Sequence, residues 1–172
     1  CRWHEIELIV KKLEKEDAKL LKAMTQSEIV YRYLPTFLFE QQYEDMEEVI
    51  KKVYEDLFKN KESIILGVYL KRNMAFCGLA EMYGLNERIH KVSIGYRLLE
   101  KYWGRGIATE VVSLMVNYLY SGTDIEIITA STMVENKASA RALAKNGFIL
   151  VSSGAEEDWG YEHMTIADKW IR

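Results

Sequence analysis

The chain has 172 residues, 49% of them hydrophobic and 28% charged, which fits one globular domain with a sizeable core. Its net charge of −3 argues against binding to nucleic acid through a broad basic face. No apolar run approaches membrane-spanning length, and the first residues lack the apolar core of a signal peptide. The two cysteines, Cys1 and Cys77, have neither metal-binding nor redox-pair spacing. We therefore expect a cytoplasmic protein with free thiols and no membrane partner.

The first part of the chain reads as strands and amphipathic helices. Ile6 to Leu13 predicts a first strand, and Glu16 to Met24 predicts a short helix with an apolar stripe. The charged segment from Gln41 to Lys59 carries apolar residues at helical spacing and predicts an amphipathic helix. Between these helices, the aromatic-rich segment Ile29 to Phe39 could form core, the wall of a substrate pocket, or both.

Strands dominate the middle of the chain, and strands alternate with helices after it. Ile64 to Leu70 and Met74 to Met82 predict two strands joined by a turn, and Lys91 to Arg97 predicts a fourth strand. The later elements expected are a helix from Gly106 to Tyr120, a strand from Ile125 to Ala130, a helix from Lys137 to Lys145, a strand that starts at Phe148 to Val151, and a last strand from Tyr161 to Ile166. This order predicts a single mixed α/β domain over residues 1–172, with helices around one sheet.

The segment from Lys101 to Glu110, KYWGRGIATE, places two glycines one residue apart where a strand-like run gives way to a helical one. Glycine has no Cβ, so a ligand can approach the main chain closely there. The first N–H groups of a helix have no internal partner and carry partial positive charge. The pattern therefore predicts a cradle for phosphate or pyrophosphate.

Two common phosphate loops do not fit this segment. A P-loop ends in Gly-Lys-Ser/Thr, whereas Ile107 follows Gly106. A dinucleotide-binding fingerprint needs Gly or Ala three residues after the second glycine, and Thr109 stands there. Two glycines alone are weak evidence, because glycines also simply make turns.

A second segment, Asn136 to Phe148, follows the expected fifth strand closely. Asn136 fits a helix N-cap, Gly147 fits a C-cap, and Phe148 re-enters the sheet. Taken alone, the segment is an ordinary capped helix. Taken together with the glycine loop, the order of the two segments is specific.

Together these segments resemble the GNAT superfamily of acetyl-CoA-dependent N-acetyltransferases, and most closely its ribosomal-protein N-terminal acetyltransferase branch (RimJ/RimL-like). The family's motif Gln/Arg-x-x-Gly-x-Gly/Ala is present as Lys101-Tyr-Trp-Gly-Arg-Gly106, with Lys in the first place. The branch's Tyr-Trp-Gly-x-Gly-x-Ala-Thr-Glu, Ile-Gly-Tyr and Asn-x-x-Ser…Lys-x-Gly-Phe patterns are matched at 102–110, 94–96 and 136–148. The resemblance covers nearly the whole chain. It implies a GNAT-like fold, with a central, mostly antiparallel sheet of six to seven strands, about four flanking helices and a splayed strand pair at the acetyl-CoA site.

The resemblance also implies acetyl-CoA as co-substrate and no metal. The pyrophosphate would lie against the N–H groups from Gly104 to Thr109, with Lys101 or Arg105 adding charge, although both cations could be solvated surface residues. Main-chain groups of Tyr96 to Leu99 would face the pantetheine arm. The full set of cofactor-binding residues expected is Leu98, Leu99, Lys101, Gly104, Arg105, Gly106, Ile107, Ala108, Thr109 and Asn136.

By the same resemblance, the acetyl group passes directly from the thioester to a primary amine, without a covalent enzyme intermediate. Ser139 matches the branch residue that can act as general acid toward the thiolate; otherwise it is a first-turn hydroxyl bonded to the helix backbone. Many relatives place a glutamate where this chain has Ser93, so Glu81 on the preceding strand is the candidate base, or else a surface carboxylate. The tyrosine that many members place beside the helix leucine is missing, because Ala144 follows Leu143.

The amine acceptor is either a protein N-terminus or a small molecule, and the protein is a monomer or a homodimer. On the last expected strand, His163 is more readily a structural histidine than a proton shuttle. The missing glutamate and tyrosine leave a second interpretation, a non-catalytic acyl-CoA-binding or regulatory domain. Aromatic residues that could line the acceptor pocket are Tyr31, Tyr33, Phe37, Phe39, Trp159 and Tyr161.

Overall fold

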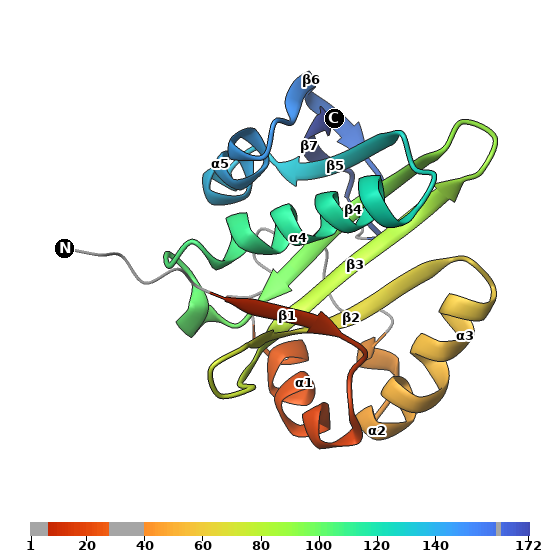
Figure 1. Ribbon diagram of the computed structural model, residues 1–172, viewed down its shortest axis with the longest axis vertical. Coiled ribbons are helices and arrows are strands. Elements are labelled where there is room, and N and C mark those ends of the chain that lie inside the picture. The colour runs from red at the N-terminus through yellow and green to blue at the C-terminus, as the bar shows by residue number, and fades with distance from the viewer. Residues whose placement is uncertain (1–6, 28–39, 161–162) are drawn as a thin grey trace.

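A computed structural model describes residues 7–27, 40–160 and 163–172. A seven-stranded sheet forms the centre, with the strand order β1-β2-β3-β4-β5-β7-β6, and helices pack on both of its faces (Figure 1). Neighbouring strands are antiparallel except β4 and β5, which are parallel. The predicted mixed α/β class and the mostly antiparallel sheet are confirmed.

The element bounds follow the sequence prediction closely in the middle of the chain and less closely at its end. The strands are β1 Leu8–Lys11, β2 Ser63–Leu70, β3 Phe76–Asn86, β4 Lys91–Leu98, β5 Ile127–Met133, β6 Ile149–Glu157 and β7 Thr165–Ile171. The helices are α1 Ala18–Thr25, α2 Met46–Glu48, α3 Tyr54–Lys59, α4 Ile107–Gly122 and α5 Lys137–Lys145. Short 3₁₀ turns occupy Lys15–Asp17, Glu40–Gln42 and Glu100–Tyr102, and a π-helical turn, Val49–Val53, joins α2 to α3.

The helix expected from Gln41 to Lys59 begins later than predicted. Asp45 is extended and its side chain accepts a hydrogen bond from the N–H of Glu47 at 3.0 Å, which is the geometry of a helix N-cap. The capped helix therefore starts at Met46, and the residues before Asp45 form a separate turn.

Alternation along β2 divides the apolar residues between two cores. Val68 and Leu70 face the larger core, which contains the apolar face of α4. Ile65 and Tyr69 point to the opposite face, where a smaller core includes Leu21 of α1. Because side chains alternate across a strand, one apolar run can support helices on both sides of the sheet.

The last two strands differ from the prediction. The final strand is Thr165–Ile171 rather than Tyr161 to Ile166, so His163 lies exposed before it and not on it. The strand continues through two charged residues, Asp168 and Lys169, and both side chains have partners on β6. Asp168 accepts from Ser153 and Gly154, and Lys169 pairs with Glu157.

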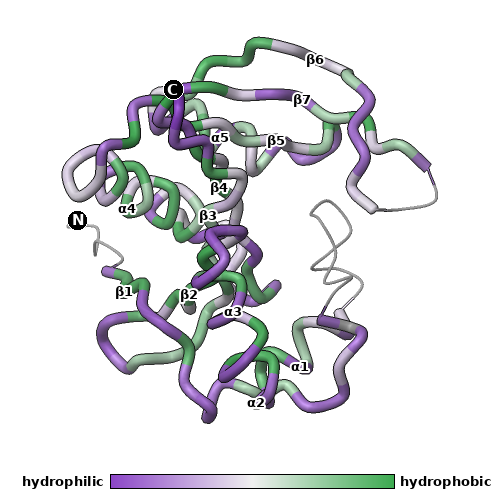
Figure 2. The backbone as a smooth tube through the Cα atoms, turned by 90° about the vertical axis from the view of Figure 1, so that its right-hand side faces the viewer, coloured by the Kyte–Doolittle hydropathy of each residue, from purple (hydrophilic) through white to green (hydrophobic). Residues whose placement is uncertain are grey.

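Strand β6 also extends to Glu157, well beyond the segment Phe148 to Val151 where the sequence predicts its start. Gly154 lies at φ +70°, and the pairing with β7 shifts register between Ser152 and Ala155. An irregularity of this kind lets a strand continue past a turn-like sequence. The strand begins with an apolar run at residues 149–151, and Figure 2 colours the chain by hydropathy. The three side chains of this run are exposed.

Strands β4 and β5 pair over only three residues each. Lys91, Val92 and Ser93 lie opposite Ile127, Ile128 and Thr129, and the pairing stops there although both strands continue. The edges of β4 and β5 beyond these residues are therefore not bonded to each other. This confirms the splayed strand pair and places the opening beside the start of α5 (Figure 1).

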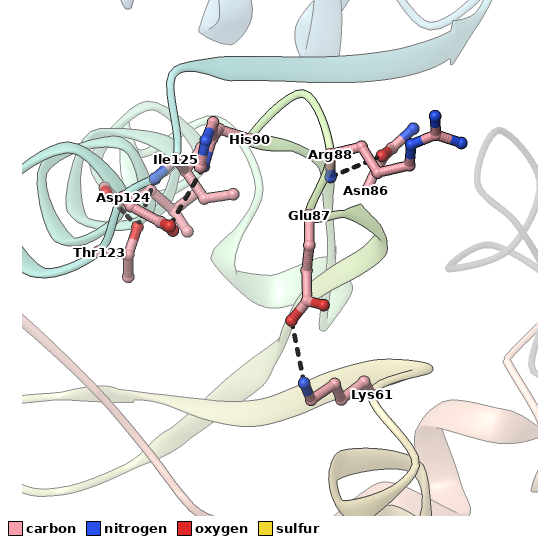
Figure 3. Close-up of polar contacts among 9 residues, drawn as sticks. Lys61, Asn86, Glu87, Arg88, His90, Thr123, Asp124 and Ile125 are labelled. Carbon is pink, nitrogen blue, oxygen red and sulfur yellow. Dashed lines mark hydrogen bonds and ion pairs between the residues drawn. The ribbon is translucent and has the colours of Figure 1, made fainter.

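Polar contacts hold the hairpin turn that joins β3 to β4 (Figure 3). Glu87 in the hairpin turn forms a 2.9 Å ion pair with Lys61, which precedes β2. His90 Nδ1 lies 3.1 Å from Asp124 Oδ2, in the connection between α4 and β5. These contacts give His90 a structural role in joining the hairpin to that connection.

Candidate active site

A cavity of about 520 Å³ lies where the loop after β4 meets the first turns of α4 and α5, and we call it the glycine-loop cavity. It brings together the two segments that the sequence singled out. Its lining includes Tyr96, Leu98, Tyr102, Trp103, Gly104, Gly106, Ala108, Thr109, Asn136 and Ser139. A volume of this size is ordinary for a small-molecule site.

The two glycines of the loop have left-handed backbone geometry. Gly104 and Gly106 have φ values of +72° and +78°, and a Cβ added to either would meet no atom within 4 Å. Glycine is therefore required there by backbone geometry and not by packing, and the main chain stays open to a ligand. The first i→i−4 bond of α4 is donated by Glu110 to Gly106 O at 3.2 Å, which leaves the earlier N–H groups of the helix for an anion.

The two cations of the loop lie beside the cavity and not in its lining. Lys101 Nζ is 5.2 Å and the Arg105 guanidinium carbon 5.9 Å from the centre of the Tyr102 ring. The Tyr102 side chain is buried, and this burial fixes the ring that both cations contact. Trp103 is exposed and lines the cavity, and its Nε1 donates a hydrogen bond to Leu98 O at 3.0 Å.

Not every predicted cofactor residue has free groups in the cavity. Leu98 lines it, but the N–H of Leu99 donates to Cys77 O and the carbonyl of Leu99 accepts from Tyr102 N–H, both at 2.9 Å. Ile107 is 1% exposed and its side chain belongs to the core, so it can offer a ligand only its main chain. Ala108 and Thr109 line the cavity as expected.

The start of α5 holds a pair of hydroxyl groups in place. Asn136 caps the helix, and its Oδ1 accepts from the N–H of Ser139 at 3.1 Å. Ser139 is 5% exposed, and its Oγ lies 2.7 Å from Tyr96 Oη. The hydroxyl of Ser139 is therefore paired with a tyrosine from β4 rather than with a carbonyl of its own helix. Sequence reasoning considered only the main chain of Tyr96, and no local pattern indicated the role of its hydroxyl.

A second cavity of about 350 Å³ adjoins the first between β3, β4, β5 and the end of β6. Tyr96 and Ser139 line both cavities, so the hydroxyl pair lies at their junction. We call the second one the carboxylate cavity, because it is lined by Glu81, Glu157 and Asp158, together with Tyr83, Arg97, Trp159, Lys169 and others.

Glu81, the predicted base, is held by two donors. Ser63 Oγ donates to Glu81 Oε1 at 2.7 Å, and Arg97 Nη2 lies 3.3 Å from Glu81 Oε2. Arg97 is also 3.6 Å from Glu40, which is 1% exposed and accepts a hydrogen bond from Tyr54 at 3.1 Å. Burial raises the pKa of Glu40 despite the opposing charge of Arg97.

Glu157 is a carboxylate of the site that sequence reasoning missed. Burial alone would raise its pKa, but hydrogen bonds from Trp159 and Lys169 bring the pKa below its usual value. The Lys169 ammonium lies 3.2 Å from it. The acidic run of residues 156–158 before Trp159 was the available signal in the sequence. Trp159 itself lines the carboxylate cavity, as expected of an acceptor-pocket residue.

Other candidates lie apart from the two cavities or outside the described residues. Cys77 is fully buried, and burial raises its pKa to about 11, which fits a core thiol. Within the described ranges, no three His, Cys, Asp or Glu side chains are arranged to hold a metal ion, and no helix is both long and apolar enough to cross a membrane. The aromatic residues Tyr31, Tyr33, Phe37, Phe39 and Tyr161 fall outside those ranges.

The sequence matches the family described as Acetyltransferase (GNAT) domain over residues 7–149. The chain belongs to the GNAT acetyltransferase family. The match covers both segments around the glycine-loop cavity and all strands up to the start of β6. The enzyme class predicted from those segments, that of the N-acetyltransferases, is confirmed.

Relatives similar in sequence are also named as N-acetyltransferases. The chain is 27% identical over 143 residues to the uncharacterized N-acetyltransferase YoaA of Bacillus subtilis, a match covering 82% of this chain and 78% of YoaA. The same identity and coverage hold for the uncharacterized N-acetyltransferase p20 of Bacillus licheniformis.

Solved structures of the family share the fold at low sequence identity. Spermidine N-acetyltransferase from Vibrio cholerae, in complex with CoA and spermine, superposes with a TM-score of 0.78 at 17% identity, covering 96% of this chain and 94% of that one. RimL, a ribosomal L7/L12 alpha-N-protein acetyltransferase in complex with CoA, gives 0.77 at 18% identity, covering 96% and 93%. The fold is thus shared by enzymes named for a polyamine and for a protein N-terminus.

Proposed function

We propose that this protein transfers the acetyl group of acetyl-CoA directly to a primary amine. The observation that carries the proposal is the junction of two cavities at Tyr96 and Ser139. One cavity offers open main chain and a helix N-terminus, which suit a diphosphate, and the other is lined by carboxylates, which suit an amine. Acetyl-CoA supplies an acyl carbon activated as a thioester.

The glycine-loop cavity fits the donor's pyrophosphate by its open main chain. No atom lies where a Cβ of Gly104 or Gly106 would be, and the free N–H groups at the start of α4 follow directly. Lys101 or Arg105 adds charge from beside the loop. Leu98 and Asn136 continue the lining toward Ser139. We propose these residues as the binding site of the donor.

Within the carboxylate cavity, Glu81 takes the proton of the amine, directly or through a water molecule. Ser63 and Arg97 hold its carboxylate in one orientation. Glu157 is less suited to the task, because its ion pair with Lys169 lowers its pKa. Ser139 donates a hydrogen bond to the sulfur as negative charge develops there.

The acceptor is a protein N-terminus or a small-molecule amine. The motif match at 102–110 favours the RimJ/RimL-like branch and so an N-terminal amine. The spermidine enzyme superposes with a TM-score similar to that of RimL, so polyamines are tested as acceptors as well. A panel of both kinds of amine therefore decides the class.

Calorimetry with acetyl-CoA tests the donor site. Gly104→Glu places a bulky anion where the pyrophosphate would bind, and we expect at least about a tenfold loss of affinity, since charged hydrogen bonds contribute about 1.5–3 kcal/mol each. Gly154→Glu is the matched control, because Gly154 has φ +70° and equally open surroundings but lines neither cavity. Equal affinity of the Gly104 variant and the wild type would refute the assignment.

Thiol release from acetyl-CoA, measured against the amine panel, tests the transfer itself. Turnover that depends on an amine and falls in Ser139→Ala supports the enzyme. Tight donor binding with no turnover on any amine would instead favour a non-catalytic acyl-CoA-binding domain.

A further inference from the structure

Tyr96 and Ser139 are the only described residues that line both cavities, and they come from different elements. Tyr96 lies on β4 beyond Ser93, where β4 has parted from β5, and Ser139 lies in the first turn of α5. Their hydroxyl oxygens are 2.7 Å apart. The splay of the strands is what allows the tyrosine side chain to reach the helix.

The chemistry of the two hydroxyls favours one direction for this hydrogen bond. A phenol is more acidic than an aliphatic alcohol, so Tyr96 is the better donor and Ser139 Oγ the better acceptor. Burial raises the pKa of Tyr96, which therefore keeps its proton at neutral pH. Ser139 Oγ then accepts from Tyr96 and has its own proton left for another acceptor.

The rest of the helix turn does not use that proton. The N–H of Ser139 is taken by Asn136 Oδ1, and within the described residues the Oγ has Tyr96 as its hydrogen-bond partner. A serine in a helix often donates back to a carbonyl of the preceding turn, which would direct its proton away from the cavity. In this protein the Ser139 Oγ is instead hydrogen-bonded to the Tyr96 hydroxyl of β4.

We propose that Tyr96 is a positioning residue, which holds the Ser139 hydroxyl with its proton directed into the junction of the two cavities, toward the sulfur of the acetyl donor. The proposal rests on the acetyl transfer proposed above. Glu81 takes the proton released from nitrogen as the C–N bond forms. Ser139 donates a hydrogen bond to the sulfur as the C–S bond breaks, and the electron pair of that bond stays on the sulfur. Tyr96 strengthens that donor, because a hydroxyl that accepts one hydrogen bond donates the next one better.

A double-mutant cycle in kcat tests the link. We expect Ser139→Ala to lower kcat about 10- to 100-fold and Tyr96→Phe about 5- to 10-fold, with KM for acetyl-CoA changed by less than about twofold. In the Ser139→Ala background, Tyr96→Phe should lower kcat no further. Independent, multiplying effects would overturn the proposal, because they would show that Tyr96 acts without Ser139.

Tyr118→Phe is the matched control. Tyr118 lies on α4, is exposed and lines neither cavity. This variant also removes a phenol oxygen and should leave kcat within about twofold of the wild type. A loss equal to that of Tyr96→Phe would point to a general effect of losing a tyrosine hydroxyl and count against the proposal.

A second readout does not require turnover. The thiol pKa of CoA bound to the protein is measured from thiolate absorbance across a pH series. A hydroxyl that donates to sulfur lowers this pKa below the ordinary thiol value of about 8.5, and Tyr96→Phe should raise it toward that value. An unchanged pKa in the variant would overturn the proposal.

The two arms separate the proposals. CoA that binds with a Tyr96-dependent thiol pKa, but without turnover on any amine, would refute acetyl transfer and support the role of Tyr96. Turnover on an amine with a thiol pKa that does not depend on Tyr96 would support acetyl transfer and refute the role of Tyr96. Failure of CoA to bind would overturn both.

Discussion

Ser93 Oγ and Thr129 Oγ1 lie 2.7 Å apart at the point where β4 and β5 separate. These residues form the last paired rung between the two strands. Both cavities open beyond it, so this hydroxyl contact marks the boundary between the closed sheet and the site. The Ser93 hydroxyl bonds the neighbouring strand at this point, and Ser93 also lines the carboxylate cavity.

We expect Ser93→Ala and Thr129→Val each to lower the free energy of unfolding by about 1 kcal/mol, because each leaves its partner's hydroxyl without this contact. The double variant should lose less than the sum of the two, since no orphaned hydroxyl is left. Chemical denaturation measures all three values. A strictly additive result would show that the two hydroxyls do not depend on each other.

A substitution of Gly78 on β3 tests how closely β3 packs against the main chain of β4. A Cβ at Gly78 would lie 2.1 Å from Arg97 O and 2.8 Å from Leu98 Cα, both main-chain atoms of β4. Main chain cannot yield as a flexible side chain does, so Gly78→Ala should lower the free energy of unfolding by about 3 kcal/mol or more. It should also weaken acetyl-CoA binding, because Leu98 lines the glycine-loop cavity.

Gly104→Ala is the comparison for that experiment. Its Cβ meets no atom within 4 Å, so the cost is limited to the left-handed backbone, about 1–2 kcal/mol. The Gly78 variant should be clearly the less stable of the two in the same denaturation assay. The reverse order would contradict the close approach of β3 and β4.

The proposed base predicts a specific loss of rate. Glu81→Gln keeps the hydrogen bond from Ser63 but removes the proton acceptor, and kcat on the best amine should fall about 10²- to 10⁴-fold. Donor affinity, measured by calorimetry, should be unchanged, because Glu81 lines only the carboxylate cavity.

Glu157→Gln provides the contrast, since the ion pair of Glu157 with Lys169 already favours its charged form. We expect a loss of rate at least tenfold smaller than that of Glu81→Gln. If Glu157→Gln or Asp158→Asn gives the larger loss, the base lies at the end of β6 and not on β3.

Local signals in the sequence were enough for much of this fold. Asn136 and Gly147 bound α5 by capping chemistry, and α5 runs from Lys137 to Lys145 as predicted. The glycines at 104 and 106 indicated an open main chain before α4, and the structure has it. Each of these features depends on residues a few positions apart, which a sequence pattern can display.

Features that depend on distant pairing escaped the sequence. The predicted last strand stopped at Ile166, because the partners of Asp168 and Lys169 on β6 are distant in the chain and no local pattern displays them. Tyr96 and Ser139 are 43 residues apart, and nothing local to either residue indicates their contact. Glu40 is a charged residue whose burial follows only from the packing of Arg97 and Tyr54 around it.

The buried carboxyl of Glu40 predicts a dependence of stability on pH. Burial raises its pKa above its usual value, and its Oε2 has no hydrogen-bond partner among the described residues. Between the unfolded pKa of about 4.3 and the raised folded pKa, the folded state holds a proton that the unfolded state has lost. This group therefore makes the free energy of unfolding fall as pH rises through that interval and stay level above it.

Glu40→Gln imitates the protonated carboxyl and can still accept from Tyr54, while Arg97 keeps its contact with Glu81. The stability of this variant relative to the wild type should therefore increase as pH rises from about 4 and then reach a plateau. Urea denaturation across a pH series measures the difference. Glu48→Gln, the same change at an exposed position of α2, controls for the loss of one negative charge. A Glu40 variant whose advantage shrinks as pH rises would mean that Arg97 outweighs burial and holds this carboxyl in its charged form.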